Sequence, residues 1–217
     1  PTGPMHLGHM IPMLKLSELQ KLGHQVILLI GDFTAMIGDP TDKTATRKQL
    51  TREQVLKNCE NYKDQAGKIL DFSGPNKAMF KFNSDWLSKM NFSDVLELSS
   101  KVTVEQMLKR DMFEKRLEEK KPIYVHEFFY PLMQGYDSVA LKSDLELGGT
   151  DQKFNLLAGR KIQPSYDQAA QAILTMELLE GTDGRKMSSS WGNTINVTDS
   201  PEQMFGKTTQ LRYHQNE

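Results

Sequence analysis

The sequence predicts an α/β fold in which strands alternate with helices around a parallel sheet. The first observation is the short, continuous apolar run at residues 26–30, typical of a strand buried on both faces of such a sheet. The second is the alternation itself, because segments with helical spacing separate this run from further short apolar runs. Ligands of such sheets bind beyond the carboxyl ends of the strands.

The remaining elements follow from apolar spacing and from capping residues. Thr51 and Gln54 match a capping box, and Pro201 suits the first turn of a helix. The expected elements are, in chain order, a helix to about 22, a strand at 26–30, a glycine-punctuated loop at 31–40, a helix from 51 to about 70, a strand at 79–82, helices within 93–121, a helix at about 126–142, a strand at 145–147, a helix from about 151, a strand at 172–176 and a helix from 201.

Composition narrows the class of protein. The 217 residues are 38% hydrophobic and 25% charged, which fits a globular chain with one large domain. The net charge of -1 excludes an overall basic field, so a nucleic acid would be met by a local patch. Cys59, the one cysteine, cannot form an internal disulfide and is expected in the core. The longest apolar run is too short for a membrane span, so no membrane contact is expected.

Two histidines stand at the predicted start of the first helix. His6 and His9 flank Gly8, close to backbone N–H groups that suit a polyphosphate. Because it lacks Cβ, Gly8 would let a ligand approach the backbone. A pair of surface histidines explains this motif alone equally well.

A second motif is the run Lys186-Met187-Ser188-Ser189-Ser190, preceded by Asp183 and Gly184. A lysine on a loop can follow negative charge onto a leaving phosphate group. Taken alone, the run is better explained as a solvated, serine-rich turn.

A polar stripe lies on the predicted helix 126–142. Tyr130, Gln134 and Asp137 are spaced i, i+4 and i+7, so they share one helical face. On so apolar a helix, this stripe indicates a small polar ligand, with a solvent-facing stripe as the alternative. A buried carboxylate can accept a hydrogen bond from a phenol, and a ligand without the hydroxyl would leave it unpaired.

The histidine motif and the Lys186 run, in this order, resemble the two signature motifs of class I aminoacyl-tRNA synthetases. Segments 38–47, 130–138 and 148–155 are similar to bacterial-type tyrosyl-tRNA synthetases, and the resemblance extends to about Lys207. It implies a Rossmann-like catalytic domain at 1–190 with a helical insertion at about 92–129. Residues 191–217 would begin the connection to a C-terminal tRNA-binding region.

The resemblance implies a tyrosine–tRNA ligase. Such an enzyme uses ATP to activate L-tyrosine as tyrosyl-adenylate and transfers it to tRNA(Tyr), with Mg²⁺ carried on the ATP phosphates. It also implies a cytoplasmic homodimer whose interface lies in the insertion. Val125, Phe128 and Phe129 are expected near that interface, with burial in the core as the alternative.

Residue roles come from the same resemblance. Asp137 would recognise the tyrosine hydroxyl by accepting its hydrogen bond. No residue is expected to bind a metal directly. The other tyrosine-binding residues would be Tyr130, Gln134 and Asp39 at the α-ammonium group, with Thr34 and Gln152 nearby. The ATP-binding residues would be Thr2, Gly8, Gly148, Gly149, Asp151 and Lys186. The residues that stabilise the reacting phosphates would be His6, His9, Lys43, Arg47 and Lys186.

Some residues allow other interpretations. Lys43 and Arg47 could belong to a solvated helix start, and Asp39 could simply initiate a turn. Ser189 occupies the position of a second lysine in the family's usual loop, which removes one positive charge. The family's first strand would precede Pro1, and residues 208–217 match no family segment.

Three other functions remain as alternatives. A tryptophanyl-tRNA synthetase shares both motifs, although Asp137 and the spacing of Tyr130 and Gln134 favour tyrosine. A small nucleotidyltransferase can carry a similar histidine element but usually lacks the segment 148–152. A synthetase-like binding module with weakened catalysis would fit Ser189.

Overall fold

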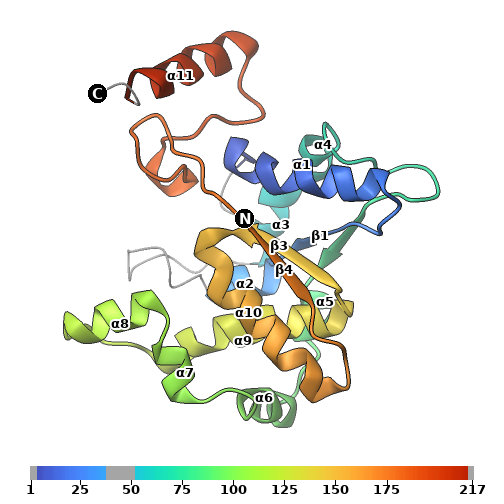
Figure 1. Cartoon of the computed structure of the whole chain (residues 1–217), viewed down its shortest axis with the longest axis vertical. Helices are drawn as coiled ribbons and strands as arrows, with labels where there is room; N and C mark the ends of the chain where they lie inside the picture. Colours follow the sequence, from blue (N-terminus) through green and yellow to red (C-terminus); the bar gives the residue numbers. More distant parts are fainter. Residues whose placement is uncertain (1–3, 38–51, 215–217) are drawn as a thin grey trace. The chain divides into compact units, whose positions relative to one another are not determined.

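The structure is a computed structural model that describes residues 4–37 and 52–214 (Figure 1). The chain divides into two compact units. The terminal unit comprises Pro1–Ile30, Glu53–Lys81 and Met176–Glu217, and the central unit comprises Gly31–Arg52 and Phe82–Thr175. None of the helices in the described ranges has both the length and the apolar character needed to cross a bilayer.

The terminal unit is built around the strand pair β1–β2. Its elements are α1 (Leu7–Lys21), β1 (Ile27–Ile30), α3 (Arg52–Cys59), α4 (Tyr62–Ala66), β2 (Met79–Phe82), the 3₁₀ turn η3 (Ser189–Trp191) and α11 (Pro201–His214). Val26, Val55, Ala66 and Leu70 are almost fully buried in this unit. The apolar spacing seen in the sequence therefore marks residues that face its interior.

The central unit contains most of the helices. Its elements are α2 (Asp32–Ile37), α5 (Ser84–Leu87), α6 (Phe92–Ser99), α7 (Val104–Leu108), α8 (Asp111–Glu118), α9 (Val125–Leu141), β3 (Leu145–Gly149), η1 (Thr150–Gln152), α10 (Lys153–Ile162), η2 (Gln163–Tyr166) and β4 (Ala172–Met176). Strand β3 pairs with β4. The α6 and α7 helices begin at capping boxes, in which Asn91 and Thr103 accept hydrogen bonds from Asp94 and Gln106 backbone N–H groups.

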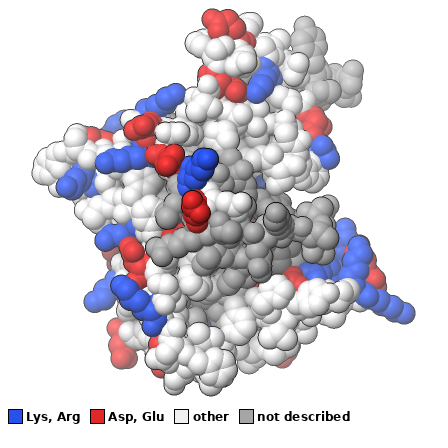
Figure 2. Space-filling model, turned by 180° about the vertical axis from the view of Figure 1, so that it is seen from behind, with Lys and Arg blue, Asp and Glu red and all other residues white. Residues whose placement is uncertain are grey.

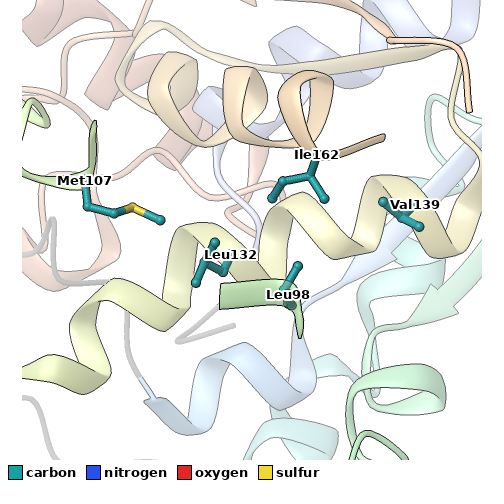
Figure 3. Packing of buried hydrophobic residues seen from close by; sticks show 5 residues of the cluster. All are labelled: Leu98, Met107, Leu132, Val139 and Ile162. Carbon is teal, nitrogen blue, oxygen red and sulfur yellow. The ribbon is translucent and has the colours of Figure 1, made fainter. Parts of the chain in front are cut away.

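An apolar cluster beside α9 holds the central unit together. It comprises Leu98, Met107, Leu132, Val139 and Ile162, with α9 and α10 lying side by side (Figure 3). Glycine lets these two helices approach closely. A Cβ on Gly159 would lie 2.4 Å from the Ser138 hydroxyl, and one on Gly135 would lie 2.7 Å from Ile162 Cδ1. Close packing therefore fixes the orientation of α9 and of the polar residues on it.

The predicted alternation of strands and helices is confirmed, and all four predicted strands are present. Within the described ranges, however, the strands form two separate pairs. Two predictions were wrong. Residues 32–37 form helix α2, which Asp32 in the first turn stabilises, and the helix expected from 51 to 70 is interrupted at residues 60–61. Asn61 is a weak helix former, which favours that break.

The burial of three further residues was left open by the sequence. Val125 is 72% exposed, whereas Phe128 and Phe129 pack against the apolar cluster. Cys59 is half-buried and does not reach the core.

Acidic and basic side chains are interspersed over the described surface that Figure 2 shows, in agreement with the near-neutral net charge.

Candidate active site

The histidine motif lies at the start of α1, as the sequence predicts. The imidazole Nδ1 of His9 accepts a hydrogen bond from the His6 backbone N–H at 3.2 Å, and the two ring centroids are 3.9 Å apart. The Leu7 N–H donates to the Ile195 carbonyl at 2.9 Å. This bond joins the motif to the segment that follows the Lys186 run, so the two motifs are neighbours within the terminal unit.

His6 is a buried imidazole, 7% exposed. Burial lowers the pKa of His6 to about 4, and positive charge on His9 and Lys186 acts in the same direction. His6 is therefore neutral at pH 7 and can donate a hydrogen bond without carrying charge. A Cβ at Gly8 would lie 3.0 Å from the His6 ring, so this glycine makes room for the imidazole.

Asn193 organises the Lys186 loop. Its buried side chain donates to Asp183 Oδ1 at 2.7 Å and to the Lys186 carbonyl at 3.1 Å, and it accepts from the Ser188 N–H at 2.9 Å. Hydrogen bonds from Asn193 and Arg185 lower the pKa of Asp183 to about 2. Lys186 lies on this loop and is exposed, and these hydrogen bonds hold its backbone in place.

Asp137 lies on α9 in the central unit and is 4% exposed. Its carboxylate accepts two hydrogen bonds, from Trp86 Nε1 to Oδ1 at 2.7 Å and from Asn83 Nδ2 to Oδ2 at 3.2 Å. Burial raises the pKa of Asp137 to about 7, and the carboxylates of Glu146 and Asp32 also raise it, against the lowering effect of both donors. The solvent-facing alternative for this residue was wrong.

Asn83 links Asp137 to Thr34. The Asn83 amide nitrogen also donates to Thr34 Oγ1 at 3.1 Å, and its oxygen accepts from the Phe33 N–H at 2.9 Å. Asp32 is 1% exposed and accepts from the Ser84 N–H at 3.0 Å. These contacts place two predicted residues, Thr34 and Asp137, on one hydrogen-bonded network.

Gln134 and Glu146 form a second polar group in the central unit. Glu146 lies on β3 and accepts hydrogen bonds from three neutral side chains, which are Gln134 at 3.3 Å, Ser138 at 3.0 Å and Gln171 at 2.6 Å. Burial raises the pKa of Glu146, although these hydrogen bonds oppose the increase. Ser138, which donates to Glu146, directly follows Asp137 on α9, so the two polar groups are neighbours.

The predicted nucleotide-binding segment follows β3. Asp151 and Gln152 lie in the turn η1, where the Gln152 side chain donates to Asp151 Oδ2 at 3.4 Å and accepts from Asn155 Nδ2 at 2.9 Å. A Cβ at Gly148 would lie 3.3 Å from Gln152 Cβ, so glycine permits a tight turn there. Gly149 ends the strand β3 and precedes the turn directly.

Four predicted site residues lie outside the described residues, namely Thr2, Asp39, Lys43 and Arg47. Tyr130 is half-buried on α9. The described ranges contain no cluster of histidine, cysteine or acidic residues that could hold a metal ion. Four polar residues of these networks were not predicted from the sequence, namely Asn83, Trp86, Glu146 and Asn193. The position of Asn83 directly after β2 is a signal that could have been used, since ligands gather at strand ends.

Comparisons with known proteins identify the family of this chain. Residues 1–216 match the family model described as tRNA synthetases class I (W and Y), and the chain belongs to that family. The match continues beyond Lys207, so the expectation that residues 208–217 match no family segment was wrong. It is 58% identical over 209 residues to a tyrosine–tRNA ligase of Carboxydothermus hydrogenoformans and 55% identical over 213 residues to that of Moorella thermoacetica. These alignments cover 95% and 97% of this chain but 50% and 51% of the relatives, so the chain spans about half their length.

Solved structures give the same class. A tyrosyl-tRNA synthetase of Archaeoglobus fulgidus, complexed with L-tyrosine, matches with a TM-score of 0.73 and 30% identity, over 95% of this chain and 61% of that one. A tryptophanyl-tRNA synthetase of Campylobacter jejuni matches with a TM-score of 0.67 and 19% identity, over 97% of this chain and 64% of that one, which establishes the fold alone. The fold is thus the α/β fold of class I tRNA synthetases.

Proposed function

We propose that this chain is the catalytic part of a tyrosine–tRNA ligase, which activates L-tyrosine with ATP and then transfers it to tRNA(Tyr). The observation that carries the proposal is the Asp137 carboxylate, buried and held by Trp86 and Asn83. A fixed, desolvated acceptor of this kind matches a phenol hydroxyl. A phenylalanine side chain would leave the carboxylate without that donor, which is unfavourable in a buried site.

The rest of the amino acid is assigned to neighbouring polar residues. Gln134 and Tyr130 stand one and two helical turns before Asp137 on α9, so they would hold the α-ammonium group together with Asp39. Thr34 and Gln152 would complete this part of the site. Support for Thr34 comes from its link to Asp137 through Asn83.

ATP is assigned to the two signature motifs and to the segment after β3. Asp151 would bind the ribose hydroxyls, while Thr2, Gly8, Gly148 and Gly149 would line the nucleotide. His6 and His9 would stabilise the α-phosphate while the tyrosine carboxylate attacks it. A neutral His6 would act there as a hydrogen-bond donor.

Three cations would accompany the departing pyrophosphate, namely Lys43, Arg47 and Lys186. Their charge would compensate the negative charge that develops on the leaving group, together with Mg²⁺ carried on the ATP phosphates. Catalysis would therefore depend on positioning and charge, without covalent participation of the protein.

The remaining proposals concern the whole protein. Residues 1–190 would form the catalytic domain and 191–217 would begin the connection to a tRNA-binding region, in a cytoplasmic enzyme. We also propose a homodimer formed through the insertion at 92–129. Its support is a set of exposed apolar side chains, which are Phe92, Leu96, Val104, Leu117, Tyr124 and Val125.

Amino-acid-dependent exchange of pyrophosphate with ATP tests the proposal. We expect exchange with tyrosine, and none above background with phenylalanine or tryptophan. Exchange with tryptophan instead would assign the chain to the other specificity of its family. A chain that binds tyrosine and ATP in calorimetry but shows no exchange would be a synthetase-like binding module, and a chain that binds neither ligand would overturn the proposal.

A further inference from the structure

Glu146 is an acid that none of the assigned roles uses, yet it contacts one of the proposed tyrosine-binding residues. Its Oε2 atom accepts two hydrogen bonds, from Ser138 Oγ and Gln171 Nε2. From the part of the chain that the structure describes, its Oε1 atom accepts one hydrogen bond, from Gln134 Nε2 at 3.3 Å. Oε2 therefore already accepts two hydrogen bonds from protein side chains, whereas Oε1 faces the amide of Gln134.

Among the described residues, none with a positive charge forms a hydrogen bond or an ion pair with Glu146. The three hydrogen-bond partners that the structure gives it among the described residues are neutral, and the side chain is half-buried. A partly desolvated carboxylate without a cation is unfavourable. A ligand that brings an ammonium group close to Glu146 would relieve this cost.

The same contact fixes the orientation of the Gln134 amide. A carboxylate only accepts hydrogen bonds, so the NH₂ group of Gln134 must face Glu146. The amide oxygen then points to the opposite side, and no described residue donates a hydrogen bond to it. An acceptor held in this way is suited to an ammonium group, which only donates.

We propose that Glu146 is a positioning residue for amino-acid recognition: it holds the Gln134 amide with its oxygen toward the α-ammonium group and adds negative charge behind it. This inference rests on the proposed function, because it assumes that Gln134 contacts that group. Glu146 itself need not touch the substrate.

The variant Glu146→Gln tests the proposal. Its amide has one acceptor oxygen for three donors, so the network rearranges and the Gln134 amide can turn its NH₂ group toward the ligand. We expect the dissociation constant of tyramine, which retains the ammonium group, to rise about 10- to 100-fold. That of 3-(4-hydroxyphenyl)propionate, which lacks this group, should change less than about threefold, since its phenol still meets Asp137.

Ser138→Ala is the matched control. It removes a donor to the same carboxylate but leaves the contact between Gln134 and Glu146 intact. The dissociation constants of both ligands should therefore change by similar, small factors. The exchanged pair Gln134→Glu with Glu146→Gln should restore tyramine binding to within about tenfold of the wild type, because position 134 again presents an oxygen acceptor to the ammonium group and the pair keeps its negative charge. All measurements use the full natural polypeptide and isothermal calorimetry.

The proposal would be overturned if Glu146→Gln weakened the binding of both ligands equally, or if it did not weaken the binding of tyramine. If that variant does not fold, the wild type decides by ¹³C NMR of the Glu146 carboxyl. Tyramine should lower its pKa and 3-(4-hydroxyphenyl)propionate should not, whereas an equal response to both ligands counts against the proposal. A wild type that binds no tyrosine would instead refute the proposed function.

Discussion

The indole N–H of Trp86 donates a 2.7 Å hydrogen bond to Oδ1 of Asp137, across a separation of 51 residues in the sequence. This contact holds one oxygen of a buried carboxylate in a fixed direction. It also opposes the cost of burial, because a hydrogen bond to the ionised form favours ionisation. The proposed recognition of tyrosine depends on this pair.

Replacing Asp137 by asparagine should weaken tyrosine binding about 10- to 100-fold, the loss expected when a charge-assisted hydrogen bond becomes a neutral one. Binding of phenylalanine should change much less, so discrimination between the two amino acids falls. Isothermal calorimetry measures both. Asp144→Asn, at an exposed aspartate, is the control and should leave tyrosine affinity unchanged. An unaltered affinity in Asp137→Asn would contradict the assignment of the hydroxyl to this residue.

Stability should depend on pH through Asp137. Folding raises the pKa of this residue from 3.8 to about 7, so the folded protein binds the proton more tightly than the unfolded chain. Its contribution to the free energy of unfolding therefore falls as pH rises from about 4 to about 7 and is constant above that range. Asp137→Asn lacks this dependence. Between about pH 4 and pH 7, the free energy of unfolding of the wild type should therefore fall by about 2–4 kcal/mol relative to that of the variant. Urea unfolding at several pH values measures this difference. If the free energy of unfolding changed with pH in the same way in both proteins, the prediction would be refuted.

Adenylate formation should not respond to titration of His6 between pH 5.5 and pH 8. Burial lowers the pKa of His6 to about 4, so the imidazole stays neutral across this range. His6→Gln should slow adenylate formation about 10²- to 10³-fold if the ring stabilises the transition state. His24→Gln, at an exposed histidine, is the matched control and should have no effect. An inflection near pH 6.5 that His6→Gln abolishes would show that His6 titrates, contrary to its burial.

Asn193→Ala should disorganise the Lys186 loop. The change leaves the Ser188 N–H without its partner, at a cost of about 1–3 kcal/mol in unfolding free energy, while Asp183 keeps its hydrogen bonds from Arg185. We expect slower adenylate formation with an unchanged dissociation constant for tyrosine. Arg185→Gln, which alters an exposed residue of the same loop, should have a smaller effect on stability. Stopped-flow kinetics that show no difference between these variants would argue against a scaffolding role for Asn193.

Val125→Asp should weaken the proposed homodimer. Val125 is 72% exposed at the start of α9, within a set of exposed apolar residues. A carboxylate buried between two subunits would be desolvated, so the dimer dissociation constant should rise at least about tenfold. Phe205→Asp, at an exposed residue of α11 outside the insertion, is the control. Sedimentation of the full natural polypeptide measures both, and an unchanged dimer in Val125→Asp would exclude this surface.

Much of the fold could be predicted from the sequence because the relevant signals are local. The apolar run at 26–30 predicts β1, and helical spacing predicts α9 with Gln134 and Asp137 on one face. Local signals failed where two tendencies compete. Glycine and proline in the segment 31–40 suggested a loop, yet its first residues form α2, where the Ala35 N–H donates to the Gly31 carbonyl at 3.0 Å.

The candidate site could be predicted only as a set of separate residues. The sequence alone determined the α/β fold, the position of the His6–His9 pair at a helix start and the polar stripe of α9, because each depends on residues a few positions apart. The tertiary structure decided which partners meet these groups: Trp86 and Asn83 at Asp137, Glu146 at Gln134, and Asn193 at the Lys186 loop. The physical reason is that burial and hydrogen bonding between distant segments, which set the pKa of Asp137 and the orientation of the Gln134 amide, exist only once the chain has packed.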